Sequence, residues 1–155
     1  MPAVCQAGIV RASWRRWFPG PKHGFARNTA VFGLAGFDEP DQLLYLFAQC
    51  VALRTWAGIR DIVMDDAPES LPALDRTLDA WSAEPDIGPR LGSEVGQYLG
   101  TVIVKCVPGA AWRVWPNGHP VVRLPSGNDL DVIAQVSRRL TSHEGTLMSI
   151  YAAAR

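Results

Sequence analysis

The chain has 155 residues, of which 48% are hydrophobic and 19% are charged, and its formal net charge is zero. This length and composition predict one folded domain with a buried core, and they exclude wholesale disorder. A net charge of zero argues against a protein built mainly to coat nucleic acid, so we do not expect a nucleic-acid partner.

The charge is unevenly distributed along the chain. Residues 1–37 carry five basic residues and no acidic ones, a sum of +5, whereas residues 38–94 carry twelve acidic residues against four arginines, a sum of −8. We predict that residues 1–28 form a partly ordered, basic and aromatic arm, and that residues 29–155 form the single domain. The candidate contacts of this arm with a membrane surface or nucleic acid are Trp14, Arg15, Arg16 and Trp17. The alternative is that the aromatic side chains dock on the domain and the basic ends pack against the acidic middle.

Apolar residues recur at helical spacing in five segments. The predicted helices span about residues 41–57, 71–81, 90–99, 130–140 and 146–154. Asp38-Glu39-Pro40 is a start signal for the first helix, and Gly58 and Gly100 are expected to end the first and the third. Asp129 or Asp131 is expected to cap the fourth.

Three runs rich in β-branched and aromatic residues follow the third helix, separated by Gly, Pro and Asn. They are Thr101–Val107, Ala111–Trp115 and His119–Leu124. Such short separations predict consecutive antiparallel strands. Thr29–Leu34 is a candidate edge strand, and Ile59–Met64 a short strand or extended link. The sequence therefore predicts an α+β fold, in which an antiparallel meander of three or more strands packs against several helices in a single compact domain.

Alternation of side chains along the second strand divides its residues between two faces. Trp112 and Val114 share the face that we expect to meet the helices, so Arg113 and Trp115 point away from it. Arg123 of the next strand is expected to join them. Two guanidinium groups beside an exposed indole predict an anionic or aromatic neighbour for this face. That neighbour is the acidic middle of the chain, a partner protein or a small ligand.

This face, with its adjoining turn, is the candidate binding site of the protein. Arginine and aromatic side chains together suit recognition of an anion, a peptide or a stacked ring. The residues of the candidate site are Arg113, Trp115, Asn117, His119 and Arg123. The alternative is that the arginines are only solvated, and that Trp115 lies under the arm or a helix.

The sequence carries no recognisable catalytic or metal-binding motif. Its three cysteines are scattered, without a C-x-x-C pair, and no histidine stands near them with ligand spacing, so we expect reduced thiols and neither a metal nor a cofactor. Asp65, Asp66 and Glu69 form an acidic loop, but acids before a helix are common for stability alone. None of the three histidines has a partner that the sequence reveals.

No apolar run approaches the roughly 20 residues needed to span a bilayer. The first residues, MPAVCQAGIVR, lack the basic and apolar regions of a secretory signal. We therefore expect a cytoplasmic protein without a transmembrane segment.

The second half of the chain carries a pattern of the form W…LG…G-x-YLGTV…VPGAxW…P-x-V-x-L-x-x-G-x-x-x-DV. The residues that carry it are Trp81, Gly96, Tyr98, Leu99, Gly100, Thr101, Val102, Pro108, Gly109, Ala110, Trp112, Pro120, Val122, Leu124, Gly127, Asp131 and Val132. Over roughly residues 38–140, the chain resembles an uncharacterised family of small proteins from Streptomyces and other actinobacteria. The resemblance implies a compact bacterial cytosolic α/β domain, and it carries over no activity or catalytic residue.

These observations together favour a non-enzymatic binding, adaptor or regulatory module. Its partner is expected to be another protein or a small anionic or aromatic ligand. One alternative is an enzyme with a site near His119 or the Asp65, Asp66 and Glu69 loop. The other alternative is a protein that binds nucleic acid or a membrane surface through the N-terminal arm.

Overall fold

The computed structural model describes residues 39–81 and 88–155, which form helices and one small sheet. The helices are α1 (Pro40–Phe47), α2 (Val51–Ile59), the 3-10 helix η2 (Pro68–Ser70), α3 (Leu71–Trp81), α4 (Gly88–Cys106), α5 (Val132–Ser142) and α6 (Leu147–Ala153). The strands are β1 (Ala111–Val114), β2 (Pro120–Arg123) and β3 (Asp129–Leu130). The predicted α+β class, with an antiparallel sheet and several helices in one compact domain, is confirmed.

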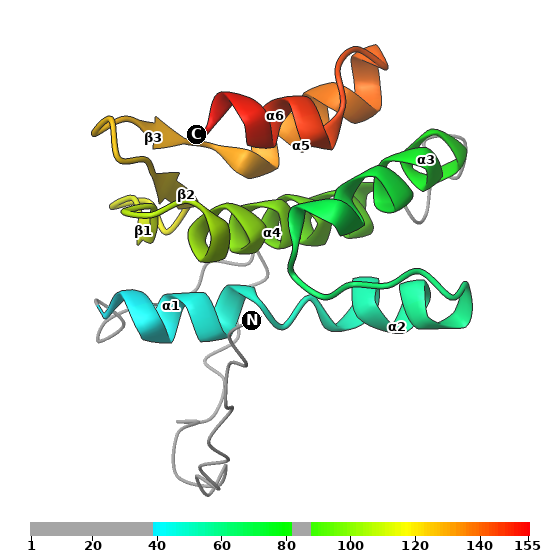
Figure 1. Ribbon diagram of the computed structural model, residues 1–155, viewed down its shortest axis with the longest axis horizontal. Coiled ribbons are helices and arrows are strands. Elements are labelled where there is room, and N and C mark those ends of the chain that lie inside the picture. The colour runs from blue at the N-terminus through cyan, green and yellow to red at the C-terminus, as the bar shows by residue number, and fades with distance from the viewer. Residues whose placement is uncertain (1–38, 82–87) are drawn as a thin grey trace, which may run out of the picture. The chain divides into compact units, whose positions relative to one another are not determined.

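Helix α4 is the centre of this domain. In Figure 1, α1 and α2 lie along one side of it and α5 and α6 along the other, while the sheet follows its C-terminal end. Tyr98, Leu99 and Ile103 of α4 are fully buried. Because α4 is covered on several sides, its apolar residues extend well around the helix rather than along one narrow stripe.

The predicted strand Thr101–Val107 is wrong, because these residues continue α4 as far as Cys106. Val102 and Ile103 prolong the helical spacing of Val95 and Leu99, and all four are fully buried. Burial at that spacing outweighs the modest helix cost of β-branched side chains.

Gly100 does not end α4 but allows the sheet to approach it. A Cβ atom at this position would lie 2.3 Å from Cη2 of Trp112. Only glycine leaves room for the indole there.

The predicted helix over residues 41–57 is interrupted, and α1 and α2 meet at a break over residues 48–50. Cys50 has the left-handed φ of 38° at the N-cap of α2. The Glu94 carboxylate of α4 accepts a hydrogen bond from the Leu53 backbone N–H at 2.7 Å, which satisfies a free donor of the first turn of α2. The break brings Phe47 and Leu53 into the core, but it leaves Val51 exposed, although Val51 continues the apolar spacing of the predicted helix.

The sheet is antiparallel in the order β1-β2-β3, and Trp112 stands opposite Val122. Both residues are buried in the core, which confirms the inward face that alternation predicted for Trp112. Only the second and third of the predicted strands are present, as β1 and β2, and the third observed strand is β3.

The other predicted helices are confirmed, with shifted ends for the third and fourth. Asp131 caps α5, accepting a hydrogen bond from the Ala134 N–H at 2.9 Å. Thr29–Leu34 and the arm of residues 1–28 lie outside the described residues, so the arm and its boundary stay predictions. No helix in the described ranges is long and apolar enough to cross a membrane.

Candidate functional site

The outer sheet face, which we define as Arg113, Trp115, Arg123 and Asp129, points away from the face that carries Trp112. Arg123 stands opposite both Ala111 of β1 and Asp129 of β3, so these residues share a face with Arg113. The register therefore brings together Arg113 and Arg123, as the sequence predicted. It adds Asp129, for which the sequence predicts only a capping role.

Asp129 is the anion that the two arginines require. Its carboxylate oxygens lie 2.5 Å from Arg123 Nε and 3.6 Å from Arg113 Nη1. Trp115 Nε1 donates a hydrogen bond to the same carboxylate at 2.9 Å, and Arg123 Nη1 donates another to the Gly127 carbonyl at 2.8 Å. The neighbour thus comes from β3 and not from the acidic middle of the chain.

The two arginines have different surroundings on this face. Arg123 makes two short contacts, whereas the Arg113 side chain is 53% exposed and lies at the long limit of an ion pair with Asp129. Two guanidinium groups share one carboxylate, so the outer sheet face carries a net charge of +1. The unbalanced charge belongs to Arg113.

His119 and Asn117 hold the turn between β1 and β2. The Asn117 side-chain oxygen accepts a hydrogen bond from the His119 backbone N–H at 3.0 Å. His119 Nε2 lies 2.9 Å from an Asp131 carboxylate oxygen, and its ring centroid lies 5.6 Å from that of Trp115. His119 therefore has an acidic neighbour at ion-pair distance that its sequence neighbours do not reveal, and the same Asp131 caps α5.

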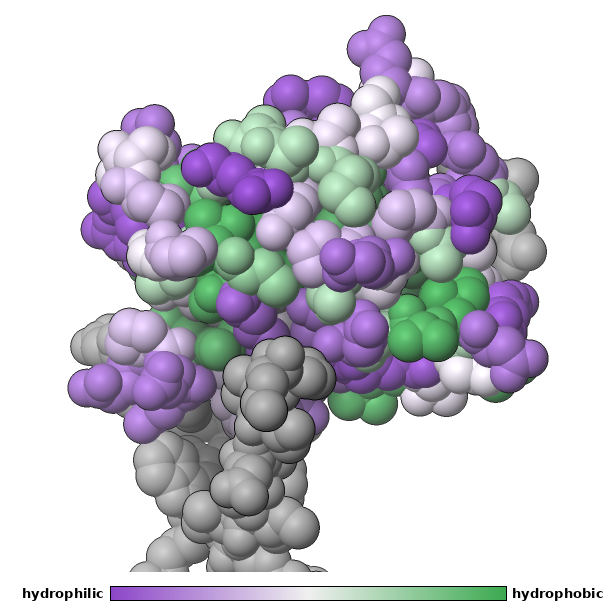
Figure 2. Space-filling view, in the orientation of Figure 1, coloured by the Kyte–Doolittle hydropathy of each residue, from purple (hydrophilic) through white to green (hydrophobic). Residues whose placement is uncertain are grey.

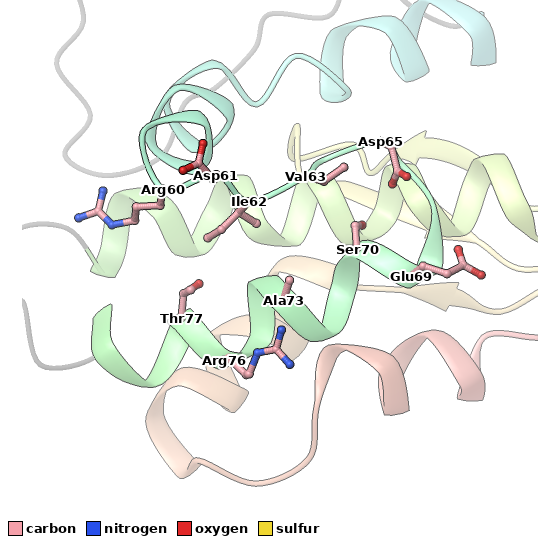
Figure 3. A pocket seen from close by; sticks show the side chains of 10 residues that line it. All are labelled: Arg60, Asp61, Ile62, Val63, Asp65, Glu69, Ser70, Ala73, Arg76 and Thr77. Carbon is pink, nitrogen blue, oxygen red and sulfur yellow. The ribbon is translucent and has the colours of Figure 1, made fainter.

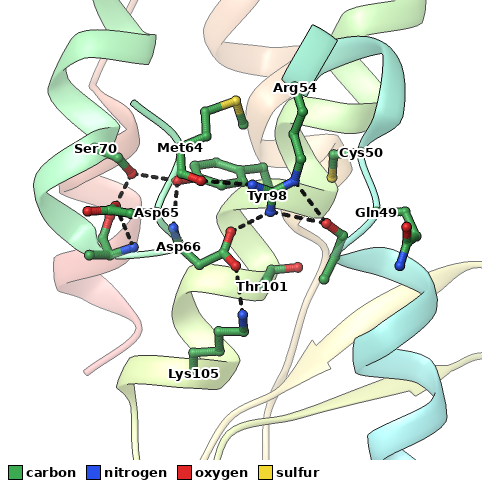
Figure 4. A network of polar contacts seen from close by, with 12 residues as sticks. Gln49, Cys50, Arg54, Met64, Asp65, Asp66, Ser70, Tyr98, Thr101 and Lys105 are labelled. Atoms are coloured by element: carbon green, nitrogen blue, oxygen red, sulfur yellow. Dashed lines mark hydrogen bonds and ion pairs between the residues drawn. The ribbon is translucent and has the colours of Figure 1, made fainter. Parts of the chain in front are cut away.

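A polar network joins α2, α4 and the connection that precedes α3 (Figure 4). Asp66, in the left-handed conformation with φ of 62°, places its carboxylate 2.5 Å from Arg54 Nη2 and 2.6 Å from Lys105 Nζ. Burial acts to raise the pKa of Asp66, but the hydrogen bonds from Lys105 and Arg54 outweigh it and lower the pKa below its usual value. Tyr98 Oη accepts the Asp66 backbone N–H at 3.1 Å and lies 2.6 Å from Ser70 Oγ.

This network fixes the path of the connection between α2 and η2. Arg54 Nη1 also donates a hydrogen bond to the Met64 carbonyl at 2.8 Å. Both Met64 and Asp66 are thus tied to the core, which holds the intervening backbone in one position.

The two described cysteines are not poised as nucleophiles. Cys50 is buried, and its thiol lies 3.2 Å from the Phe47 carbonyl and 3.4 Å from the Glu94 carbonyl. Burial, together with the Glu94 charge, raises the pKa of Cys50 to about 12. Cys106 is exposed, but burial of its sulfur and nearby acids also raise its pKa. Both thiols therefore stay protonated near neutral pH.

A groove lies between the connection over residues 60–65 and the facing side of η2 and α3, and we call it the α2–α3 groove. It encloses about 610 Å³. Figure 3 shows Ile62 pointing from the connection towards α3, and Ser70, Ala73 and Thr77 pointing back towards the connection. In Figure 2 an apolar patch lies on the same connection, at the right of the view, bordered by hydrophilic side chains. Sequence patterns alone had not indicated this groove.

The acids of the predicted loop take different directions. Asp66 turns inward to Arg54 and Lys105, while Asp65 and Glu69 line the α2–α3 groove and are exposed. Over residues 39–81 and 88–155, no three side chains of the His, Cys, Asp or Glu type are arranged to hold a metal ion. The candidate residues Trp14, Arg15, Arg16 and Trp17 lie outside the described part of the chain.

The fold and these sites define a small α+β domain with a central helix, a charged sheet face and an open groove. The chain belongs to a family of unknown function (DUF6278), whose model matches residues 14–155. The comparison with curated proteins found no match, and neither did the comparison with solved structures. Membership of a family of unknown function is thus confirmed, while its actinobacterial origin stays a prediction.

Proposed function

We propose that the protein is a non-enzymatic binding module, and that the outer sheet face with Asn117 and His119 is its recognition surface. The observation that carries this proposal is the exposed Arg113 guanidinium beside Trp115, on a face where Asp129 balances only one of two arginines. As part of the same proposal, we place the module in the cytoplasm of an actinobacterium.

The partner that this surface suits carries an anionic group next to an aromatic or apolar one. A carboxylate or phosphate pairs with the Arg113 guanidinium through two parallel hydrogen bonds. The Trp115 indole, already oriented by its bond to Asp129, offers a ring edge and face beside that charge. An acidic, aromatic segment of a protein supplies both groups.

Selection from a random peptide library displayed on phage tests this proposal without a known partner. Peptides selected on the wild-type protein should be enriched in Asp or Glu beside an aromatic residue. Arg113→Ala should weaken their binding by about tenfold, which corresponds to one charge-assisted contact.

Arg138→Ala is the matched control for this experiment, because Arg138 of α5 is also exposed and forms no ion pair with a described residue. This variant removes an equal positive charge at a position outside the sheet, and it should leave binding of the peptides unchanged. Selected peptides that bind Arg113→Ala as tightly as the wild type would contradict the proposal.

A further inference from the structure

The connection between α2 and η2 presents an unpaired edge of backbone at the α2–α3 groove. The N–H groups of Val63, Met64 and Asp65 donate no hydrogen bond to any described residue. Side-chain exposure alternates along this segment, with Val63 and Asp65 exposed and Ile62 and Met64 half-buried. Alternation of this kind is the pattern of an extended segment with one face on the protein and the other in solvent. The backbone groups of alternate residues then share one edge, and because Arg54 binds the Met64 carbonyl, the edge of Val63 and Asp65 is the available one.

Apolar surface lies beside these free backbone groups. Val63 is 67% exposed, and Ile59 at the end of α2 is 75% exposed. Unpaired backbone next to exposed β-branched side chains is a template on which an extended segment adds as a strand, with its main-chain groups supplying affinity.

The charges around the groove select a cationic segment. Asp65 and Glu69 line it, are exposed, and form no ion pair with a described residue, whereas Asp61 points away from the groove in Figure 3. Arg60 also lines it, but its guanidinium stacks over the Trp56 ring at 4.0 Å and points away from the groove in Figure 3. Arg76 is then the arginine that remains to balance the lining carboxylates, so negative charge exceeds positive charge at the groove.

We propose that the α2–α3 groove binds an extended cationic segment of a partner protein, which pairs by backbone hydrogen bonds with Val63 and Asp65. Lysine or arginine of that segment meets Asp65 and Glu69, and its apolar residues lie on Val63. The polar network of Arg54, Asp66 and Lys105 keeps the accepting backbone in place, so little ordering cost arises on binding. This surface is separate from the outer sheet face.

The test uses a fluorescent hexapeptide of alternating lysine and valine, followed by anisotropy at low salt, with an otherwise identical glutamate-valine peptide as its counterpart. We expect only the lysine peptide to bind. Asp65→Asn combined with Glu69→Gln should weaken binding by about tenfold. The matched pair Asp41→Asn with Glu144→Gln removes two exposed acids elsewhere and should not change it.

Amide hydrogen exchange distinguishes strand addition from loose electrostatic contact. Bound peptide should slow exchange at Val63 and Asp65, whose N–H groups share one edge of the segment, and leave exchange at Met64 unchanged. Three results would each overturn the proposal. The first is binding of the peptide without that protection, and the second is binding to the Asp65 and Glu69 double variant that is as tight as binding to the wild type. The third is protection of these amides in the absence of peptide, through self-association. Arg113→Ala should bind the lysine peptide normally, which separates failure of this inference from failure of the proposed function.

Discussion

Replacing Trp112 with alanine should lower the free energy of unfolding by about 3–5 kcal/mol. The indole is 3% exposed, its ring centroid lies 4.7 Å from that of Phe47, and it packs against the bare backbone of Gly100. Truncation leaves a large cavity where α1, α4 and the sheet meet. Urea unfolding of the purified variant measures the loss.

A glycine variant tests the same contact from α4, and a second glycine variant is its control. Gly100→Ala places a methyl group against the indole and should destabilise the protein, although alanine favours helix by about 1 kcal/mol. Gly58→Ala in α2 is the matched control, because its Cβ would meet nothing within 4 Å, and it should stabilise slightly. A midpoint for Trp112→Ala equal to that of the wild type would contradict the packing described here.

Replacing Arg139 with methionine should cost about 3 kcal/mol, because it leaves a buried carboxylate without its cation. Arg139 of α5 is 7% exposed; its Nε lies 3.5 Å from Asp75 and its Nη1 2.9 Å from Asp79, both on α3. Asp75 also accepts the first N–H of α6, from Leu147, at 3.4 Å. One guanidinium therefore joins α3, α5 and, through Asp75, α6.

Arg138→Met is the control for this variant, because the neighbouring arginine is exposed, and its cost should stay within about 0.5 kcal/mol. Hydrogen bonds from Arg139 and His143 lower the pKa of Asp79 below its usual 3.8. The associated stability is therefore present above that pH and is lost as the pH falls. Equal unfolding midpoints for the two methionine variants would show that Arg139 does not hold the helices together.

The length of α4 could have been predicted from one signal that β propensity obscured. Gly92, Gly96 and Gly100 recur every four residues, which is the spacing of a helix face that others approach closely. A Cβ atom at Gly96 would indeed lie 2.8 Å from the Ile133 Cα of α5. Treating Gly100 as a stop signal divided one helix into a helix and a strand.

The break between α1 and α2 had no comparable local signal. The apolar spacing from Leu43 to Leu53 is continuous, and neither Gly nor Pro interrupts it. The break is accompanied by a local hydrogen bond from Arg54 to the Ala48 carbonyl, and by one tertiary contact, between Glu94 and the Leu53 N–H. Partners 41 residues apart cannot be read from periodicity.

The strand register of the candidate site could be predicted from the sequence, but the balance of charges on its surface could not. Alternation along β1 correctly placed Trp112 inward and Arg113 outward. Asp129 was missed as their partner because its strand has only two residues, and an acid at that place in the sequence also fits a helix cap. The α2–α3 groove depends on how the connection between α2 and η2 is anchored to α4, and no motif marks it.

The central claim is that Arg113 is free to bind a partner, whereas Arg123 serves the fold. Thermal unfolding of Arg113→Ala and Arg123→Ala, measured side by side, tests it most directly. We predict that Arg113→Ala unfolds close to the wild type, since an exposed pair at 3.6 Å contributes between 0 and about 1 kcal/mol. Arg123→Ala should unfold at a lower temperature, because Asp129 and the Gly127 carbonyl lose their closest donor. An equally low unfolding temperature for Arg113→Ala would mean that both arginines belong to the fold, and it would contradict the recognition surface.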